Sequence, residues 1–357
     1  MNKGKVILNI DKINHFNSMM KNKCDFLYNM NINKISKKEL TNYIINEKIP
    51  ILPKYDNTLI TDRILNACLL NRNIFNIKDC IIRKGLVINR TILKSLPTNT
   101  RFFNNLKEKD FNLIANTALI INTFVLIFHE SLDKKWFYVR SYFYQGWVNK
   151  KDIAITDIKT DYSTFVIVTS PLIKINNKYI DMSAKFQLVK ELENKYKVIL
   201  YDFKNEKLLK KEVYILKSDS NLGYMLYTKE NVIMQALKYK DINYGWGGMN
   251  NGVDCSSFII NIFNLFGFMF PRDTINQKKV VGNIINTSKM SNLEKINIIN
   301  NLKNPALIYT DYHVLLHIKD NCVIHASSVL KKVQVDFLNN VNGNNLYKSI
   351  SSINKIF

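Results

Sequence analysis

The clearest hydrophobic pattern of the chain begins directly after Asp254. Apolar side chains recur there with the spacing of one helix face and stop at Gly267; they stand at positions 258, 259, 262, 263 and 266. This period predicts a helix that opens at Cys255, with Asp254 as its N-cap. A glycine-rich turn at 244–252 precedes the helix, and its glycines allow backbone to approach the sulfur closely.

A second pattern, further along the chain, alternates with the period of a strand. His313, Leu315 and His317 share one face, a polar turn follows at 319–321, and a short second strand carries His325. The pattern predicts a hairpin, in which neighbouring strands lie about 4.8 Å apart. His313 and His325 can therefore be cross-strand neighbours. We interpret His317 as a packing residue, because no distinct role is left for it.

Upstream, aromatic and β-branched residues alternate with period two between positions 128 and 155, which predicts a small β-barrel. The most apolar window, 113–128, contains Asn and Thr and is too short to span a bilayer. Strands of the same barrel explain this window better than a membrane span does. Another run of predicted strands, at 162–226, indicates a second barrel.

The first 95 residues carry the weakest patterns. Helical periods around 17–30 and 36–49 predict two helices, the second with an N-cap at Ser36. The stretch 93–103 is expected to be an extended connection, since Pro97 disfavours helix at the residue before it. We expect this segment to act as a structural clamp.

A thiol and two imidazoles in one folded unit have the composition of a cysteine hydrolase. The positive end of a helix dipole favours a thiolate over a thiol, so Cys255 is expected to be nucleophilic near neutral pH. Taken alone, a buried Cys is more often a small hydrophobe, and a single His on a strand is equally uninformative. The interpretation depends on finding Cys255, His313 and His325 together, in this order.

Residues 225–340 resemble the NlpC/P60 family of papain-like cysteine peptidases. The resemblance rests on the motifs Tyr-x-Trp-Gly-Gly, Asp-Cys-Ser, Pro-Arg-x-Ser/Thr-x-x-Gln, His-Val and Ile-His-Ala. These motifs are matched at Tyr244, Trp246, Gly247, Gly248, Asp254, Cys255, Ser256, Pro271, Arg272, Thr274, Gln277, His313, Val314, Ile324, His325 and Ala326. The upstream barrels are similar to bacterial SH3-like domains.

The resemblance implies an α+β protein with a papain-like NlpC/P60 catalytic domain. We expect a mainly helical N-terminal segment at 1–98, SH3-like β-barrels at 99–157 and 158–222, and the cysteine peptidase domain at 223–357. This order of domains resembles that of the γ-D-glutamyl-L-diamino acid endopeptidases.

The resemblance also implies roles for individual residues. Cys255 is expected to be the nucleophile, His313 the general base and acid, His325 the residue that orients His313, and Tyr244 a contributor to the oxyanion site. Substrate-binding residues are implied as well. Asp254 and Ser256 match residues that hold a substrate amine, Thr274 stands where the family usually has Ser, and one of Tyr138, Tyr142 and Tyr144 should contact substrate, with Tyr142 favoured.

Composition excludes several classes of protein. The five cysteines lack the spacing of zinc ligands, so we expect neither a metal nor a cofactor. The net charge of +22 is spread along the whole chain, and no basic-aromatic module indicates a nucleic-acid partner. Membrane insertion is not expected either, and the sequence leaves the oligomeric state open.

The resemblance to the γ-D-glutamyl-L-diamino acid endopeptidases implies that the substrate is a murein peptide with a free N-terminal L-Ala, cut at the bond between γ-D-Glu and the diamino acid. An endopeptidase that acts on intact or crosslinked peptidoglycan is one alternative. A peptidoglycan-binding protein without catalysis is another. Because the start of the chain interrupts its apolar run with charged residues, no secretory signal is visible, and a cytoplasmic location is favoured unless a leader has been removed.

Overall fold

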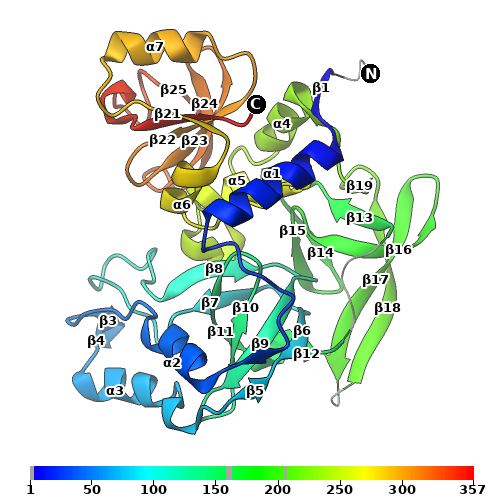
Figure 1. Ribbon diagram of the computed structural model, residues 1–357, viewed down its shortest axis with the longest axis vertical. Helices are drawn as coiled ribbons and strands as arrows, with labels where there is room; N and C mark the ends of the chain where they lie inside the picture. Colours follow the sequence, from blue (N-terminus) through cyan, green and yellow to red (C-terminus); the bar gives the residue numbers. More distant parts are fainter. Residues whose placement is uncertain (1–3, 158–162, 205–206) are drawn as a thin grey trace.

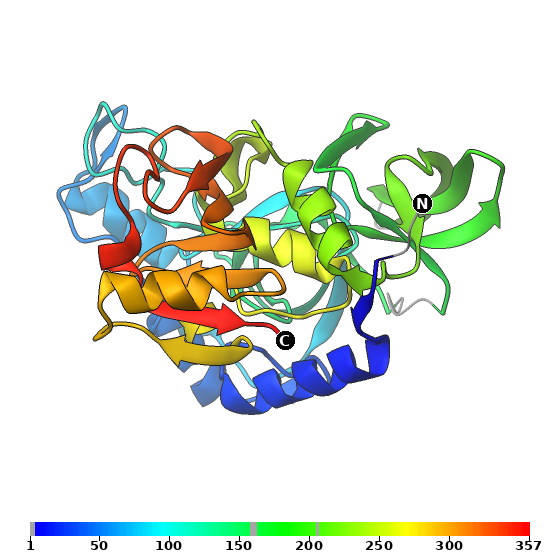
Figure 2. The same ribbon diagram turned by 90° about the horizontal axis from the view of Figure 1, so that it is seen from above.

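The protein was analysed as a computed structural model that describes residues 4–157, 163–204 and 207–357. Residues 1–3 of the N-terminal segment, 158–162 of the expected second barrel and 205–206 lie outside the described residues. In Figures 1 and 2 the C-terminal unit packs on two β-rich units. The β-rich unit that comes second along the chain lies on the side of the molecule opposite to helices α2 (Lys37–Ile45) and α3 (Asp62–Leu70).

The C-terminal unit is built on a six-stranded antiparallel sheet. In spatial order its strands are β21 (Asn283–Asn286), β26 (Ser352–Lys355), β22 (Ala306–Tyr309), β23 (Val314–Lys319), β24 (Cys322–Ser327) and β25 (Lys332–Phe337). Its helices are α4 (Lys229–Leu237), α5 (Cys255–Asn264), α6 (Thr274–Val280) and α7 (Asn292–Asn300), with 3-10 helices η3 (Trp246–Asn251) and η4 (Tyr347–Ser349). The predicted hairpin is confirmed, since β23 and β24 pair antiparallel.

The first β-rich unit is a seven-stranded sheet. Its strands, in spatial order, are β12 (Ile153–Ile155), β6 (Arg83–Val87), β9 (Phe124–Glu130), β10 (Trp136–Arg140), β11 (Gln145–Asn149), β7 (Thr91–Lys94) and β8 (Ala115–Leu119), with η2 at Lys150–Asp152. The apolar window 113–128 does supply strands of this unit, β8 and part of β9. Strands β6 and β7 precede residue 99, so the sheet begins earlier than the expected barrel boundary. Strand β6 ends in three consecutive buried residues and so shows no alternation, and β7 has only four residues.

The second β-rich unit contains a five-stranded sheet and a separate hairpin. The sheet consists of β18 (Lys207–Leu216), β17 (Lys195–Lys204), β16 (Lys185–Glu191), β13 (Phe165–Val168) and β19 (Ser220–Leu222), and the hairpin of β14 (Leu172–Ile175) and β15 (Lys178–Asp181). Its core is a separate cluster of buried side chains, including Val166, Phe186 and Val198. The strands expected from the run at 162–226 are therefore present.

The N-terminal segment wraps the other units. Its elements are β1 (Val6–Leu8), α1 (Ile10–Lys23), β2 (Lys34–Ile35), α2 (Lys37–Ile45), β3 (Tyr55–Asp56), β4 (Thr58–Leu59), α3 (Asp62–Leu70), η1 (Ile74–Asn76) and β5 (Cys80–Ile81), and β1 pairs with β20 (Tyr227–Thr228) of the C-terminal unit. Ser36 caps α2 as predicted, accepting a hydrogen bond from the Glu39 N–H.

The first helix differs from its predicted position. It was expected around 17–30, but α1 ends at Lys23 and starts after an N-cap at Asn9, whose side chain accepts from the Lys12 N–H. The buried face of α1 belongs to the core of the C-terminal unit, where the Phe16 ring lies 5.5 Å from that of Phe268. This cap and this tertiary contact decide where the helix begins.

The first sheet and the C-terminal unit meet where η3 lies on β8. The Gly247 backbone is left-handed, with φ of 57°, and a Cβ atom there would lie 2.7 Å from the Ala115 carbonyl oxygen. Only glycine combines this conformation with so close an approach.

Among the described residues, no helix is long and apolar enough to cross a membrane.

We expect Gly247→Ala to destabilise the protein more than Gly223→Ala does. Both glycines have positive φ, but a Cβ at Gly223 would meet nothing within 4 Å. The backbone strain of about 1 kcal/mol is therefore common to both variants, and only Gly247→Ala adds a clash with β8. Thermal melting of the two variants checks this, and equal melting temperatures would show that η3 does not depend on close contact with the sheet.

Candidate active site

Helix α5 begins at Cys255, as the hydrophobic pattern predicts. The Asp254 carboxylate accepts from the Ser257 N–H at 2.9 Å, and the Ser257 hydroxyl oxygen accepts from the Asp254 N–H at 2.9 Å. These two bonds form a capping box, which satisfies backbone donors at the start of the helix. The N-cap predicted at Asp254 is thereby confirmed.

The Cys255 sulfur lies between two other elements of the unit. Its Sγ is 3.6 Å from the Thr274 hydroxyl oxygen at the start of α6, and it accepts a hydrogen bond from the Val314 N–H on β23. Burial and the neighbouring Asp254 charge raise the pKa of the Cys255 thiol above its ordinary value. Desolvation therefore opposes the thiolate that the helix dipole favours.

His313 and His325 form a hydrogen-bonded pair beside this sulfur. His313 Nε2 lies 2.8 Å from His325 Nδ1, and the two rings meet edge to face with 4.9 Å between their centroids. The prediction that the hairpin brings these imidazoles together is confirmed. Burial, together with His325, lowers the pKa of His313 to about 3, so the resting imidazole is neutral. His317 is buried and its Nε2 contacts the Asp320 carbonyl oxygen at 2.7 Å.

Asp336 on β25 extends this pair, and the sequence analysis missed it. Its carboxylate lies 3.0 Å from His325 Nε2 and accepts a hydrogen bond from the N–H of that nitrogen. His325 Nδ1 is then left as an acceptor, and His313 must place its own proton on Nε2. The free lone pair of His313 is therefore on Nδ1, the only ring nitrogen left to serve as a base. The sequence does carry one signal for Asp336: the polar residues Gln334 and Asp336 alternate along a strand that follows the hairpin.

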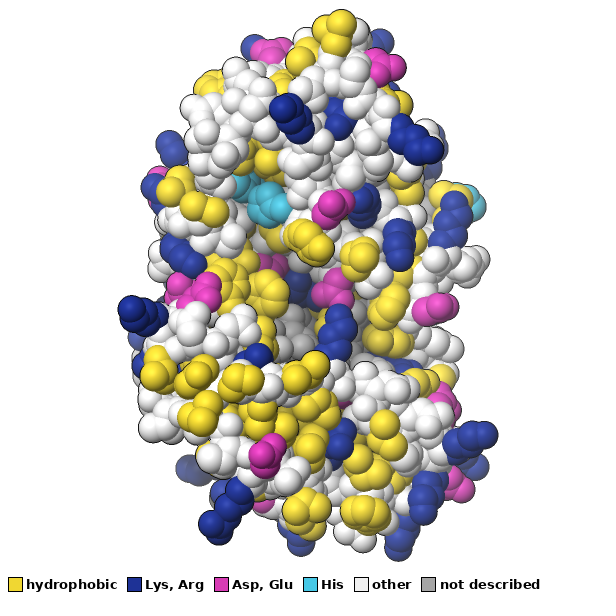
Figure 3. Space-filling model, turned by 90° about the vertical axis from the view of Figure 1, so that its left-hand side faces the viewer, with side chains coloured by type: hydrophobic (Ala, Val, Ile, Leu, Met, Phe, Trp, Pro, Cys, Tyr) yellow, Lys and Arg dark blue, Asp and Glu magenta, His cyan; other side chains and the backbone are white. Residues whose placement is uncertain are grey.

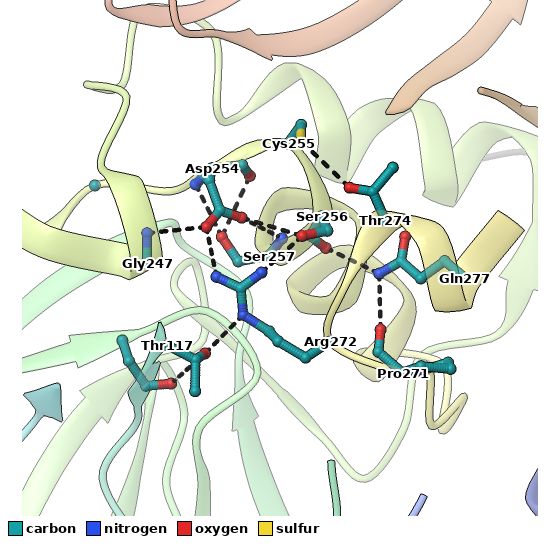
Figure 4. A network of polar contacts seen from close by, with 12 residues as sticks. Thr117, Gly247, Asp254, Cys255, Ser256, Ser257, Pro271, Arg272, Thr274 and Gln277 are labelled. Atoms are coloured by element: carbon teal, nitrogen blue, oxygen red, sulfur yellow. Dashed lines mark hydrogen bonds and ion pairs between the residues drawn. The ribbon is translucent and has the colours of Figure 1, made fainter. Parts of the chain in front are cut away.

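The Asp254 side chain is held by a buried cation. Arg272, 4% exposed, forms an ion pair with it through Nη2, donates from Nη1 to the Ser256 hydroxyl at 2.6 Å, and donates from Nε to the Thr117 hydroxyl at 2.7 Å. The Gly247 N–H also donates to the carboxylate, at 3.0 Å. Figure 4 shows this network on the side of α5 away from the Cys255 sulfur. It ties strand β8 to the start of the helix.

This network bears on the roles expected for Asp254 and Ser256. Both were expected to hold a substrate amine, but Arg272 already neutralises the Asp254 carboxylate. Burial raises the pKa of Asp254, and Arg272 with the cap hydrogen bonds more than reverses this, so the pKa lies below its ordinary value. An incoming ammonium would have to share a carboxylate that a buried guanidinium occupies.

The three candidate tyrosines lie in different places, and Tyr142 has to be corrected. The Tyr142 hydroxyl lies 3.4 Å from the Asn264 side-chain oxygen at the last residue of α5, which is about 13 Å along the helix from Cys255. Tyr138 is buried and donates to the Glu47 carboxylate at 2.7 Å. Tyr144 is half-buried, and the charges of Asp273 and Arg272 act on its hydroxyl. Asp273 and Arg272 are not among the charges that act on the hydroxyls of Tyr138 and Tyr142. The geometry of the loop decides which tyrosine lies close to these residues, and the sequence does not reveal that geometry.

Tyr244 lies in the turn before Cys255. Its N–H donates to the Lys331 carbonyl oxygen at 2.8 Å, and its ring is 6.1 Å from that of Phe111, which precedes β8. Burial, with the Asp254 and Cys255 charges, raises the pKa of its hydroxyl, so the group remains a proton donor. No hydrogen-bond partner for this hydroxyl occurs within the described part of the chain, and its oxyanion role stays a prediction.

Asp273 is a second residue that the sequence analysis missed. It precedes Thr274 and occupies the N-cap position of α6, yet its side chain makes no cap hydrogen bond. Burial raises the pKa of Asp273, while Arg272 and Lys48 oppose this effect. Figure 3 shows a hollow on one side of the molecule, with histidine side chains at its upper rim and hydrophobic, acidic and basic groups around it. Within the described ranges, no cluster of His, Cys, Asp and Glu could hold a metal ion.

Arg272→Met should strongly destabilise the protein, because it leaves the Asp254 carboxylate buried without its cation. Breaking such a pair costs about 3–5 kcal/mol, whereas an exposed pair contributes at most about 1 kcal/mol. Arg101→Met is the matched control, since Arg101 pairs with Asp56 at 3.1 Å on the surface. Chemical denaturation measures both. Equal losses of unfolding free energy in the two variants would mean that the buried pair does not hold the first sheet to the helix. Adding Asp254→Asn to Arg272→Met should recover part of the stability that Arg272→Met loses.

Asp336→Ala should lower kcat about 10- to 100-fold, less than the loss of the general base itself, which costs about 10²- to 10⁴-fold. Without its acceptor, His325 can carry its proton on Nδ1 and force His313 into the unproductive tautomer. Steady-state kinetics measure kcat, and ¹⁵N chemical shifts of the histidine rings report the tautomer. Asp311→Ala is the control, an exposed carboxylate near Lys278. Unchanged ¹⁵N shifts in Asp336→Ala would contradict the positioning role.

Comparison with known proteins agrees with this geometry. Residues 101–149 match the SH3 domain of SH3b1 type, and residues 241–351 match the NlpC/P60 family. A γ-D-glutamyl-L-lysine dipeptidyl-peptidase of Bacillus subtilis (strain 168) is 27% identical over 142 residues, which cover 38% of this chain and 46% of that protein. The matched region therefore spans less than half of this relative.

Two solved structures share the fold. An NlpC/P60 endopeptidase from Photobacterium damselae subsp. piscicida superposes with a TM-score of 0.73 at 21% identity, covering 98% of this chain and 87% of the other. An NlpC/P60 family protein from Bacillus cereus ATCC 10987 gives a TM-score of 0.58 at 17% identity, covering 76% and 99%. The chain thus carries an NlpC/P60 family domain, preceded by an SH3 domain of the SH3b1 type.

Proposed function

We propose that this protein is a cysteine peptidase that hydrolyses the bond between γ-D-Glu and the diamino acid in murein peptides with a free N-terminal L-Ala. The observation that carries the proposal is the ordered set Cys255, His313, His325 and Asp336, with a thiol at a helix start and a hydrogen-bonded relay beside it. The similarity to a γ-D-glutamyl-L-lysine dipeptidyl-peptidase supports the choice of bond.

Acylation starts from a neutral thiol and a neutral imidazole. His313 Nδ1 takes the proton from Cys255 Sγ as the sulfur attacks the γ-carbonyl carbon of D-Glu. The imidazolium that forms donates through Nε2 to His325, and the Asp336 carboxylate stabilises the resulting positive charge. His313 then protonates the departing amine of the diamino acid, which leaves an acyl group on the sulfur.

The second half of the reaction regenerates the thiol. The Cys255 N–H at the helix start and the Tyr244 hydroxyl are the donors available for the oxyanion. His313, neutral again after the amine has left, removes a proton from water, and the hydroxide attacks the thioester carbonyl. Collapse of that intermediate releases the peptide acid and returns the proton to Cys255.

The first sheet forms a wall beside these groups. Phe111 packs on Tyr244 and lies 5.4 Å from the Trp246 ring, and Thr117 binds Arg272 behind the start of α5. A wall at this position limits how far a substrate extends past the γ-D-Glu carbonyl. Short peptides are favoured over stems attached to glycan.

Asp273 is the best candidate to receive the free amine. A buried, unpaired ammonium costs several kcal/mol, so a closed end of the cleft needs a carboxylate that is not already neutralised. Asp254 is paired with Arg272, whereas the Asp273 carboxylate has no hydrogen bond or ion pair within the described residues and adjoins Thr274. Tyr144, on which the Asp273 charge acts, can add a hydroxyl.

The decisive assay uses L-Ala-γ-D-Glu-L-Lys and its N-acetylated form, with products followed by mass spectrometry. We expect the protein to release lysine from the free-amine peptide only, and Cys255→Ala to release none. Cleavage of both peptides would remove the requirement for a free amine. Cleavage of neither, combined with retention on intact sacculi, would favour a non-catalytic binding protein.

The same assay tests Asp273. Asp273→Asn should reduce kcat/KM for the free-amine peptide about 10- to 100-fold, the value of a hydrogen bond to a charged group. Asp241→Asn is the control, because Asp241 is an exposed carboxylate that pairs with Lys332 at 2.6 Å. Equal activity of the two variants would place the amine at another group, without affecting the assignment of Cys255.

A further inference from the structure

A pocket lies at the end of α5 far from Cys255, where the N-terminal segment, both β-rich units and the C-terminal unit meet. It has a volume of about 240 Å³, and each of these parts of the chain contributes to its walls, with Met30, Phe124, Lys185 and Asn264 among the lining residues. Because a water molecule occupies about 30 Å³ of liquid, this volume equals that of about eight waters. A ligand of about eight non-hydrogen atoms therefore fits inside the pocket.

One wall of the pocket carries a cation without a counter-charge. The Lys185 ammonium donates to the Tyr224 hydroxyl at 2.6 Å. The centres of the Tyr224 and Phe165 rings lie 4.5 and 5.2 Å from it, and these rings attract a cation without accepting its proton. No carboxylate lies within ion-pair distance of this ammonium in the part of the chain that the structure describes. An ammonium carries several N–H donors, so Lys185 keeps donors for a ligand after it has bonded to Tyr224.

The polar ends of Lys185 and Tyr224 lie beside the pocket wall at Gly267. A Cβ atom on Gly267, which lines the pocket, would be 3.4 Å from Tyr224 Cζ, the ring carbon that carries the hydroxyl. The Lys185 ammonium is bonded to this hydroxyl and therefore lies at the same wall. Both side chains are half-buried, so the surrounding chain does not enclose them. Since the tyrosine oxygen accepts from the ammonium, the Tyr224 O–H is free to donate in turn.

A third donor comes from the last residue of α5. The Asn264 side-chain oxygen accepts from the Tyr142 hydroxyl at 3.4 Å, whereas the Asn264 side-chain nitrogen has no hydrogen-bond partner within the described residues. Asn264 is half-buried, and this nitrogen is not among the enclosed polar atoms that lack a partner. It is therefore open to a ligand. Lys185, Tyr224 and Asn264 all present donors, the arrangement that binds a carboxylate.

The remaining walls are compatible with an anion that has an apolar body. Free carbonyl groups at a helix end favour positive charge, but those at this end of α5 are already bonded. The Asn264 carbonyl oxygen accepts from the Gly267 N–H at 3.1 Å, and the Gly267 carbonyl oxygen accepts from the Asn17 side chain at 2.8 Å. Apolar side chains, including Ile120 and Phe124, form much of the rest of the lining.

We propose that this pocket binds a free aliphatic carboxylate with about six carbon atoms, a length set by the volume of the pocket. Its carboxylate meets the donors of Lys185, Tyr224 and Asn264, and its hydrocarbon chain meets Ile120 and Phe124. Because all parts of the chain contribute to the pocket, such a ligand stabilises their assembly. The site is separate from the peptidase cleft and does not depend on the proposed reaction.

The test is calorimetric titration of the full chain with hexanoate. We expect binding, a higher melting temperature with ligand, and an affinity weaker by about tenfold or more in Lys185→Met, the value of a hydrogen bond to a charged group. Lys195→Met is the matched control and should bind normally, since Lys195 lies in the same unit and stacks at 4.3 Å on Tyr214. If Lys185→Met fails to fold, Tyr224→Phe replaces it, because this change removes one donor and keeps the ring, and a weaker affinity is again expected.

Further ligands test the chemical class. Hexanamide lacks the negative charge, and acetate and inorganic phosphate lack the hydrocarbon chain, so we expect each to bind about tenfold or more weakly than hexanoate. No binding of hexanoate at millimolar concentration would overturn the proposal. Equal affinities of Lys185→Met and Lys195→Met would place the ligand elsewhere. Binding of hexanamide, acetate or phosphate as tight as that of hexanoate would contradict the assignment to aliphatic carboxylates.

Discussion

The buried ion pair between Asp254 and Arg272 is the interaction on which the site depends. The Asp254 carboxylate caps α5 and so fixes the position of Cys255, and the Arg272 guanidinium carries that constraint to Thr117 of the first sheet. Because both charges are removed from water, neither partner is replaceable alone. The SH3 domain is therefore a structural part of the active site. Gly247 contributes to the same joint through its N–H and its close approach to β8.

A second constraint fixes which ring nitrogens of His325 and His313 carry a proton. The Asp336 carboxylate can only accept, so it fixes the His325 tautomer, which in turn fixes that of His313. Burial raises the pKa of the Cys255 thiol and lowers that of His313, so it disfavours a charged thiolate–imidazolium pair. The hydrogen bonds that orient the base are thus complete before substrate binds, which favours rapid proton transfer.

The sequence predicted the local structure of the site well and its tertiary partners poorly. Helix α5, its Asp254 cap and the histidine hairpin follow from short-range periods, which a single sequence carries. Asp336, Asp273 and the misplaced Tyr142 depend on which strands and loops meet in space, and no period encodes that. The early strands β6 and β7 were missed for a related reason. Strand β6 buries three consecutive residues and β7 has only four, and both are stabilised by pairing with β9, β11, β8 and β12. Helix α1 lies earlier in the chain than predicted, because its N-cap and its contact with Phe268 outweigh the local hydrophobic pattern.

The proposed nucleophile lies at a helix start, the proposed base contacts one further residue of a hydrogen-bonded chain of two, and an accessory domain is fixed to the back of the same helix. In the proposed reaction Cys255 attacks the γ-carbonyl of D-Glu and carries the acyl group. Rapid mixing of the protein with L-Ala-γ-D-Glu-L-Lys, acid quenching and intact-mass measurement with peptide mapping test it directly. We expect an L-Ala-γ-D-Glu acyl group on Cys255 that disappears as lysine release is completed. Turnover of the peptide with the acyl group on another residue would contradict it.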